Sequence, residues 1–182
     1  MEGHTLVPVV TFGPNDDPKA FMDFLIAQDV RCIEVTLRTP EGIKAIQALK
    51  QNYGSDVLIG AGTVTQEAQV AQLVAIGADF MVSPGLTPEL HQVMERSDLP
   101  YLPGVATPSE IMRAVEMGLD TLKFFPADLF GGMKALKAYG QVFGDVAFCP
   151  TGGITRETSA DFLALNNVFA VGGSWFQKEY KG

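Results

Sequence analysis

The chain has 182 residues, of which 47% are hydrophobic and 19% are charged, and its formal net charge is −8. These values predict one globular domain over residues 1–182 with a sizeable core. The apolar runs are too short to span a bilayer, the first residues lack the basic and apolar parts of a signal peptide, and the acidic balance argues against a nucleic-acid surface. A site for an anionic ligand must therefore be local.

Short apolar runs alternate with amphipathic stretches along the whole chain. In chain order, strands are predicted at 6–12, 32–37, 57–61, 80–83, 101–102, 121–125, 146–149 and 168–171. Helices are predicted between them, at 18–28, 40–51, 66–76, 88–96, 108–117 and 158–165. Three of these helices begin with threonine followed by proline, a pair typical of a helix start, at 39–40, 87–88 and 107–108.

This alternation predicts an α/β fold, and the count of eight strands favours a (β/α)8 TIM barrel over an open doubly wound sheet. The chain is shorter than the ~200-residue lower end of that fold. Only five residues precede Leu6 and eight remain from Trp175 onward. We therefore expect a barrel shortened at both ends, with a reduced N-terminal helix and a reduced eighth helix. Either the eighth helix is missing, or a neighbouring subunit covers that side.

Two isolated cysteines, Cys32 and Cys149, lie inside apolar runs and have no metal-ligand spacing. They are expected to be reduced core residues of a cytoplasmic protein. No cluster of histidine, cysteine and carboxylate residues predicts a metal site, and no nucleotide-binding motif is present.

Two strands carry polar side chains where a core strand would be apolar. With period two, Glu34, Thr36 and Arg38 share one face of their strand. Lys123 lies between apolar and aromatic residues, and because burial disfavours its charged form, some free amine should be present near neutrality. Such an amine attacks ketones and forms Schiff bases.

If Lys123 points into the barrel, it meets Glu34 there. A buried structural salt bridge is the alternative interpretation of this pair. The polar side chains of Thr36 and Arg38 on the same face favour a functional one, because barrel interiors are normally filled with branched apolar residues. The residues thus support the hypothesis of an enzyme that acts on keto acids.

Glycine-rich segments follow three predicted strands. Residues 60–64 place Thr63 at the rim, although a structural turn explains that segment better when it is taken alone. The pair Gly152-Gly153 follows the seventh strand, and the pair Gly172-Gly173, with Ser174 after it, follows the eighth. Since barrels often bind phosphate with the loops after these two strands, the glycine pairs together predict a phosphate site.

The strings at 33–39, 60–64, 83–85, 123–127, 149–154 and 172–175 resemble, in order, the bifunctional 2-keto-3-deoxy-6-phosphogluconate (KDPG) and 4-hydroxy-2-oxoglutarate (KHG) aldolases. The resemblance covers nearly the whole chain. It implies a class I aldolase of the Entner–Doudoroff pathway with a (β/α)8 fold, which needs no metal or other cofactor and is usually a homotrimer. Some relatives carry an arginine at the end of the first strand, where this chain has Val10-Thr11-Phe12, and this departure weakens the case for a second cation near the phosphate.

The resemblance also implies a role for each matching residue. Lys123 would form the Schiff base, Glu34 would shuttle protons, and Arg38 and Thr63 would hold the pyruvate carboxylate. The remaining roles are binding of the distal phosphate, by Gly152, Gly153, Gly173 and Ser174, and lining of the pocket, by Thr36, Pro84, Phe125 and Thr151.

The implied reaction is reversible cleavage of KDPG to pyruvate and glyceraldehyde 3-phosphate, and of KHG to pyruvate and glyoxylate. Two alternatives stay open. One is an aldolase for the epimeric 2-keto-3-deoxy-6-phosphogalactonate, and the other is a non-catalytic homologue that only binds a phosphorylated sugar acid. The four residues Glu34, Arg38, Thr63 and Lys123 argue against the second, because binding alone needs no reactive amine.

Overall fold

The computed structural model describes residues 3–180, in which nine strands alternate with eight helices. The strands are β1 (Leu6–Val10), β2 (Cys32–Thr36), β3 (Leu58–Gly62), β4 (Phe80–Val82), β5 (Tyr101–Leu102), β6 (Gly104–Val105), β7 (Thr121–Phe124), β8 (Ala147–Pro150) and β9 (Val171–Gly173). The helices are α1 (Pro18–Ile26), α2 (Glu41–Tyr53), α3 (Glu67–Ala75), α4 (Pro88–Arg96), α5 (Pro108–Glu116), α6 (Gly132–Val142), α7 (Arg156–Leu163) and α8 (Trp175–Glu179).

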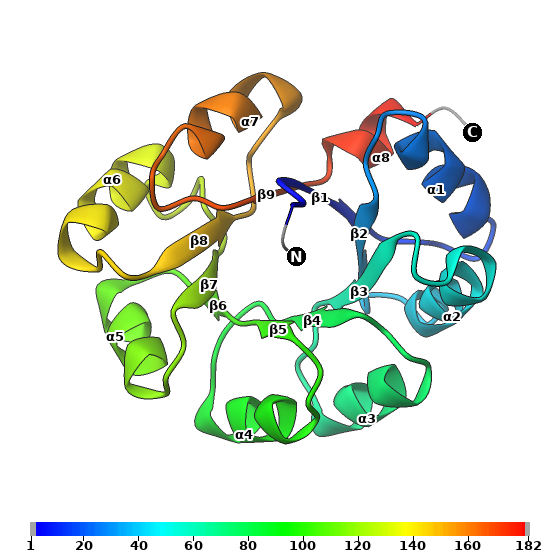
Figure 1. The fold of residues 1–182 in the computed structure, drawn as a ribbon, viewed down its shortest axis with the longest axis horizontal. Coiled ribbons are helices and arrows are strands. Elements are labelled where there is room, and N and C mark those ends of the chain that lie inside the picture. The colour runs from blue at the N-terminus through cyan, green and yellow to red at the C-terminus, as the bar shows by residue number, and fades with distance from the viewer. Residues whose placement is uncertain (1–2, 181–182) are drawn as a thin grey trace.

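All strand pairs are parallel, and the strands form a curled sheet with the helices on its outer side (Figure 1). Six strands are hydrogen-bonded in the order β5-β4-β3-β2-β1-β9, and the other three in the order β6-β7-β8. Two single parallel bridges link the smaller group to the other: Phe148 pairs with Val168, before β9, and Thr151 pairs with Gly172 of β9. The predicted α/β class is therefore confirmed.

The strand predicted at 101–102 is β5, and Pro103 separates it from β6, which was not predicted. β5 pairs with β4 on one side of this proline, and β6 pairs with β7 on the other. The backbone N–H of Lys123 donates to the Pro103 carbonyl at 2.8 Å, so the sheet continues past the proline on the β7 side. Because proline has no N–H to donate, it interrupts a strand ladder.

The threonine-proline pairs differ in what they do. The hydroxyls of Thr87 and Thr107 accept hydrogen bonds from backbone N–H groups in the first turns of α4 and α5, as predicted. The prediction for Thr39 was wrong, because its hydroxyl donates to the Phe12 carbonyl at 2.7 Å and α2 begins without a side-chain cap. Thr39 thus ties the loop after β2 to the chain after β1.

The core has two parts. Side chains such as Leu122 and Phe124 point outward from β7 into a large cluster shared with the helices. A smaller cluster fills the inner side of the sheet and consists of Val7, Cys32, Phe80, Val82, Leu102, Cys149 and Ala170. Both cysteines are buried and free, and burial raises the pKa of each thiol to about 12. Their predicted place in the core is confirmed.

The eighth helix is present but has only five residues. Trp175 and Phe176 bury their rings under it, and Arg156 of α7 forms hydrogen bonds to both carboxylate oxygens of Glu179. The Arg156 guanidinium also lies 5.3 Å from the centre of the Phe176 ring. These contacts hold a helix that is too short to be stable alone. Within residues 3–180, none of the helices has the length and apolar character needed to cross a membrane.

Candidate active site

A buried ion pair crosses the inner side of the curled sheet. Nζ of Lys123, on β7, lies 3.0 Å from Oε1 and 3.3 Å from Oε2 of Glu34, on β2. The two residues are only 5% and 3% exposed. β2 and β7 belong to the two different strand groups, so the pair joins them. The structure therefore brings together the two residues that the strand period placed on inward faces.

Two glycines on β3 make room for the carboxylate. In the parallel register, Glu34 lies beside Gly60 and Thr36 beside Gly62. A Cβ atom on Gly62 would lie 2.1 Å from Oε1 of Glu34, and one on Gly60 would lie 2.3 Å from the Phe80 ring. The sequence analysis treated these glycines as possible turn residues. Their spacing of two, on a strand, was the available signal for a close approach from one face.

The contact between Lys123 and Glu34 is short enough for a proton to pass between the two side chains. Transfer of one proton from the ammonium of Lys123 to Glu34 leaves a neutral amine and a carboxylic acid, with no net charge buried in either form. The Lys123 ammonium also lies 5.4 Å from the centre of the Phe125 ring, an arrangement that stabilises a cation. The site can thus supply both a nucleophilic amine and a proton carrier.

Arg38 and Thr63 meet at the rim, at the carboxyl ends of β2 and β3. Nε of Arg38, an exposed residue, donates to the Thr63 hydroxyl at 3.3 Å. Thr63 has a φ of 62°, which is unusual for a β-branched residue and marks local backbone strain of the kind found at functional sites. A guanidinium and a hydroxyl held side by side suit a carboxylate ligand.

Two more predicted pocket residues have different surroundings. Thr36 is fully buried, and its hydroxyl is 2.7 Å from that of Thr11. Pro84 is exposed, and its backbone lies 2.4 Å from where a Cβ on Gly104 would be. The backbone of Pro84 therefore packs closely against Gly104 of β6.

The glycine loops after β8 and β9 lie next to each other. The bridge between Thr151 and Gly172 joins them, and a Cβ on Gly172 would lie 2.2 Å from the Thr151 hydroxyl oxygen. That hydroxyl is buried and has no hydrogen-bond partner among the described residues. Gly152 and Gly153 have φ values of 104° and 72°, which favour glycine.

The second glycine pair continues into α8. Gly173 is covered by the Trp175 ring, and Ser174 is exposed at the start of the short helix. The four predicted phosphate residues thus lie on two neighbouring loops. Asp128 was missed by the sequence analysis: its carboxylate lies 2.5 Å from where a Cβ on Gly153 would be, and so faces the same loop.

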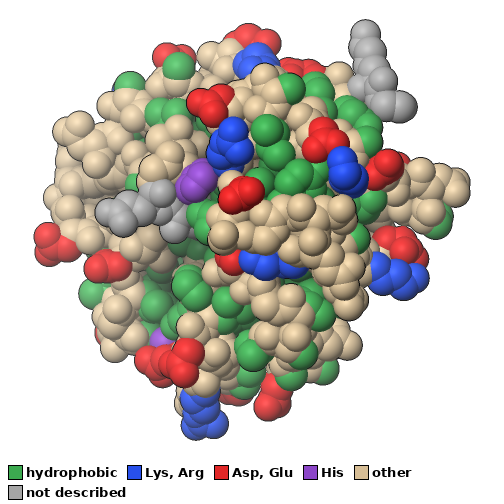
Figure 2. Space-filling view, turned by 45° about the vertical axis from the view of Figure 1, so that its right-hand side comes forward, with side chains coloured by type: hydrophobic (Ala, Val, Ile, Leu, Met, Phe, Trp, Pro, Cys, Tyr) green, Lys and Arg blue, Asp and Glu red, His purple; other side chains and the backbone are tan. Residues whose placement is uncertain are grey.

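The face seen in Figure 2 has no broad area of one charge, because acidic, basic and apolar side chains are interspersed on it. Some of the charges form local pairs, such as Lys19 and Asp23 at 2.7 Å. The chain has 13 basic and 21 acidic residues. An anionic ligand must therefore be held by nearby groups such as Arg38 rather than by the overall field.

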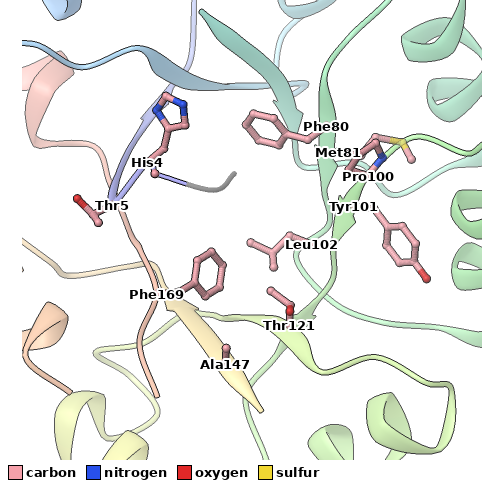
Figure 3. A pocket seen from close by; sticks show the side chains of 11 residues that line it. His4, Thr5, Phe80, Met81, Pro100, Tyr101, Leu102, Thr121, Ala147 and Phe169 are labelled. Atoms are coloured by element: carbon pink, nitrogen blue, oxygen red, sulfur yellow. The ribbon is translucent and has the colours of Figure 1, made fainter. Parts of the chain in front are cut away.

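A cavity of about 470 Å³ lies at the other end of the sheet, among the first residues of several strands (Figure 3). Most of its lining is apolar or aromatic, as with Phe80, Leu102 and Phe169, and His4 lies at its edge. Burial lowers the pKa of His4. Since catalytic groups of parallel α/β barrels lie at the carboxyl ends of the strands, this cavity is not the candidate active site. Among residues 3–180, no three His, Cys, Asp or Glu side chains gather as metal ligands would.

Comparison with known proteins places these features in a family. The family model for KDPG and KHG aldolase matches residues 1–181. The chain is 43% identical over 170 residues to a 2-dehydro-3-deoxy-phosphogluconate aldolase of Dickeya dadantii, an alignment that covers 93% of this chain and 79% of the relative. It is 41% identical to the KHG/KDPG aldolase of Escherichia coli K12, with the same coverage of both chains.

Among solved structures, the crystal structure of KDPG aldolase from Legionella pneumophila superposes with a TM-score of 0.90 and 43% identity. The match covers 94% of this chain and 84% of that chain, and that structure holds pyruvate captured as a covalent carbinolamine intermediate. The family-model match, the identity over most of the chain and the shared fold all point to the same family. This chain belongs to the KDPG and KHG aldolase family.

Proposed function

We propose that this chain is a class I aldolase that reversibly cleaves KDPG to pyruvate and glyceraldehyde 3-phosphate, and KHG to pyruvate and glyoxylate. The observation that carries the proposal is the lysine–carboxylate contact of 3.0 Å, buried on the inner side of the sheet. A lysine used only for binding an anion would not be held against a carboxylate away from water.

In the first half of the reaction, a proton passes from Lys123 to Glu34, and the neutral amine attacks the ketone carbon of the substrate. The carbinolamine hydroxyl takes the proton back from Glu34 and leaves as water, which gives a protonated imine and restores the Glu34 carboxylate. The C=N⁺ group then accepts the electrons of the C3–C4 bond when that bond breaks.

In the second half, Glu34 as a carboxylate takes the proton of the C4 hydroxyl, either directly or through one water. The C4 oxygen forms the carbonyl of the leaving aldehyde, the C3–C4 bond breaks, and its electrons form an enamine with the imine. Glu34 returns the proton to C3, and hydrolysis of the imine releases pyruvate and restores the amine. Every proton taken in one step is returned in another, so no cofactor is needed.

The binding roles follow the arrangement of the rim. Arg38 and Thr63, which already contact each other, hold the carboxylate of the pyruvate part. The adjacent loops hold the distal phosphate through Gly152, Gly153, Gly173 and Ser174. The pocket between them is lined by Thr36, Pro84, Phe125 and Thr151. The buried hydroxyl of Thr151, which has no partner among the described residues, is available to a substrate hydroxyl.

We also propose the finer architecture that this function implies. The nine strands form a closed (β/α)8 barrel in which β5 and β6 are one strand interrupted at Pro103, and residues 1–182 form one aldolase domain. The bridge between Thr151 and Gly172 supports closure on the other side. A homotrimer and a cytoplasmic location, where the two buried thiols stay reduced, complete the proposal.

Borohydride trapping tests the nucleophile. The unaltered chain, mixed with ¹⁴C-pyruvate and reduced with borohydride, should gain one stable label on the peptide that contains Lys123. Lys123→Ala should lose the label, and Lys134→Ala, which removes an exposed lysine of α6, should keep it. Label that survives in Lys123→Ala would place the nucleophile elsewhere.

Substrate choice needs a separate measurement. Pyruvate release from KDPG, from its phosphogalactonate epimer and from KHG should be compared at equal enzyme concentration. The highest kcat/KM is expected for KDPG. A higher value for the epimer would reassign the substrate while leaving the reaction class intact, and no release from any of the three would favour a homologue that only binds.

A further inference from the structure

Gln177 of α8 pairs with the backbone of Thr11 as a neighbouring strand would. The Thr11 N–H donates to Oε1 of Gln177 at 3.1 Å, and Nε2 of Gln177 donates to the Thr11 carbonyl at 2.7 Å. The two residues are 166 positions apart. A carboxamide presents the same donor and acceptor as a peptide group, so Gln177 completes the backbone pairing of Thr11.

The need for this pairing follows from where β9 ends. β1 pairs with β9 only as far as Pro8 and Gly173, after which the chain turns through Ser174 into α8. Thr11 lies three residues beyond Pro8, just past the end of β1, and no residue of β9 pairs with it. The side chain of Gln177 takes that place, and it does so from the helix that begins directly after the turn at 173–174.

The same threonine continues the connection to β2. Val9 and Val10 pair with Glu34 and Val35, which brings Thr11 beside Thr36. The Thr11 and Thr36 hydroxyls lie 2.7 Å apart. Thr36 is fully buried and stands two residues beyond Glu34 on the same face of the strand.

These contacts form a continuous path from α8 through β1 to β2. We propose that Gln177 and Thr11 are positioning residues of the aldolase reaction, a proposal that rests on the function proposed above. Gln177 holds the turn at 173–174 against β1 and thereby places the phosphate-binding loop. Thr11 holds Thr36 and thereby the end of the strand that carries Glu34. Neither residue touches the reacting atoms.

The two halves of the path predict different kinetic effects. Loss of the Gln177 contacts loosens the turn at Ser174, so it should weaken binding only of a substrate that carries the distal phosphate. Loss of the Thr11 hydroxyl acts on β2, so it should lower turnover of phosphorylated and unphosphorylated substrates alike. A general loss of structure would change both kcat and KM, and would do so for both substrates.

The experiment measures kcat and KM for KDPG and for KHG, which has no phosphate, in the unaltered chain and in two pairs of variants. Gln177→Met should raise the KM for KDPG about tenfold, as expected for two lost hydrogen bonds, and leave that for KHG within twofold. Its control is Lys178→Met, which changes an exposed side chain of the same helix. Thr11→Val should lower kcat about fivefold for both substrates, and Thr11→Ser, which retains the hydroxyl, should keep it within twofold.

The outcomes separate the path from the activity itself. The role of Gln177 is overturned if the unaltered chain cleaves both substrates and Gln177→Met changes the KM for KDPG and KHG equally, or changes neither. Equal kcat values for Thr11→Val and Thr11→Ser overturn the role of Thr11. No cleavage by the unaltered chain overturns the proposed function and the path with it. Melting temperatures show whether each variant folds. If Gln177→Met does not fold, Thr11→Val and Thr11→Ser still test the path.

Discussion

Gly62→Ala is a small change with a large expected effect on activity. The new Cβ would lie 2.1 Å from Oε1 of Glu34 and 2.7 Å from its carboxyl carbon. To reach an ordinary contact of 3.4 Å, the oxygen has to move by about 1.3 Å. Because Glu34 is buried, its carboxylate has little room to move, and the 3.0 Å contact with Lys123 must lengthen or turn. The substitution therefore displaces the proposed base without removing it.

The magnitude follows from the two consequences of that shift. Overpacking at a buried position costs about 1–3 kcal/mol of the free energy of unfolding. Misplacing a general base costs about 10²-fold or more in rate. We therefore expect kcat for KDPG cleavage to fall at least about 10²-fold while the protein still folds, as followed by pyruvate release and by urea denaturation.

The matched control is Gly144→Ala, because a Cβ on Gly144 meets nothing within 4 Å. That variant should keep the activity of the unaltered chain within twofold. A Gly62→Ala protein with unchanged kcat would show that the position of the Glu34 carboxylate does not control the rate, and it would refute the reasoning.

Three further predictions concern buried and capping groups. Lys123→Met leaves the carboxylate of Glu34 buried without its partner, so the free energy of unfolding measured by urea denaturation should fall by about 3–5 kcal/mol. The double variant Lys123→Met, Glu34→Leu should recover most of that loss, and equal stability of the single and double variants would contradict the prediction. Burial raises the pKa of Cys32 and Cys149 from the ordinary 9.0 to about 12, so the free energy of unfolding should fall as the pH rises above about 9, and the double alanine variant should show a smaller fall. Burial alone raises the pKa of Glu110, but hydrogen bonds from backbone N–H groups outweigh it and lower the pKa below 4.5; the resulting stability is present above that value and is lost as the pH falls, so Glu110→Gln should flatten the decline between about pH 5 and pH 3 in thermal denaturation.

The alternation of strands and helices and the pairing of Lys123 with Glu34 could both be predicted, because each depends on local periodicity. Period two decides which face of a strand a side chain occupies, and parallel strands around one centre bring their inward faces together. The neighbouring loops at Gly152 and Gly173 follow from the same rule, since both come after strands that end at the same side of the sheet.

Other features depend on contacts that a local pattern does not contain. No bounded helix was predicted for α6, which begins at Gly132 directly after Gly131, and both glycines have positive φ values. The division of a strand at Pro103 could not be located from an apolar run of two residues. The contacts of Thr39 and Gln177 reach across the structure to the residues directly after β1, so only the assembled sheet shows them.

The Lys123–Glu34 contact has a consequence for how the molecule acquires its chemistry. Residues up to 102 contain the carboxylate, and residues from 104 onward contain the amine, so each side of Pro103 is inert by itself. Covalent capture of pyruvate then reports that the two parts have come together correctly, and partly assembled chains would be silent in that assay. The ion pair that is hidden from water therefore also indicates whether the two parts of the sheet are correctly assembled.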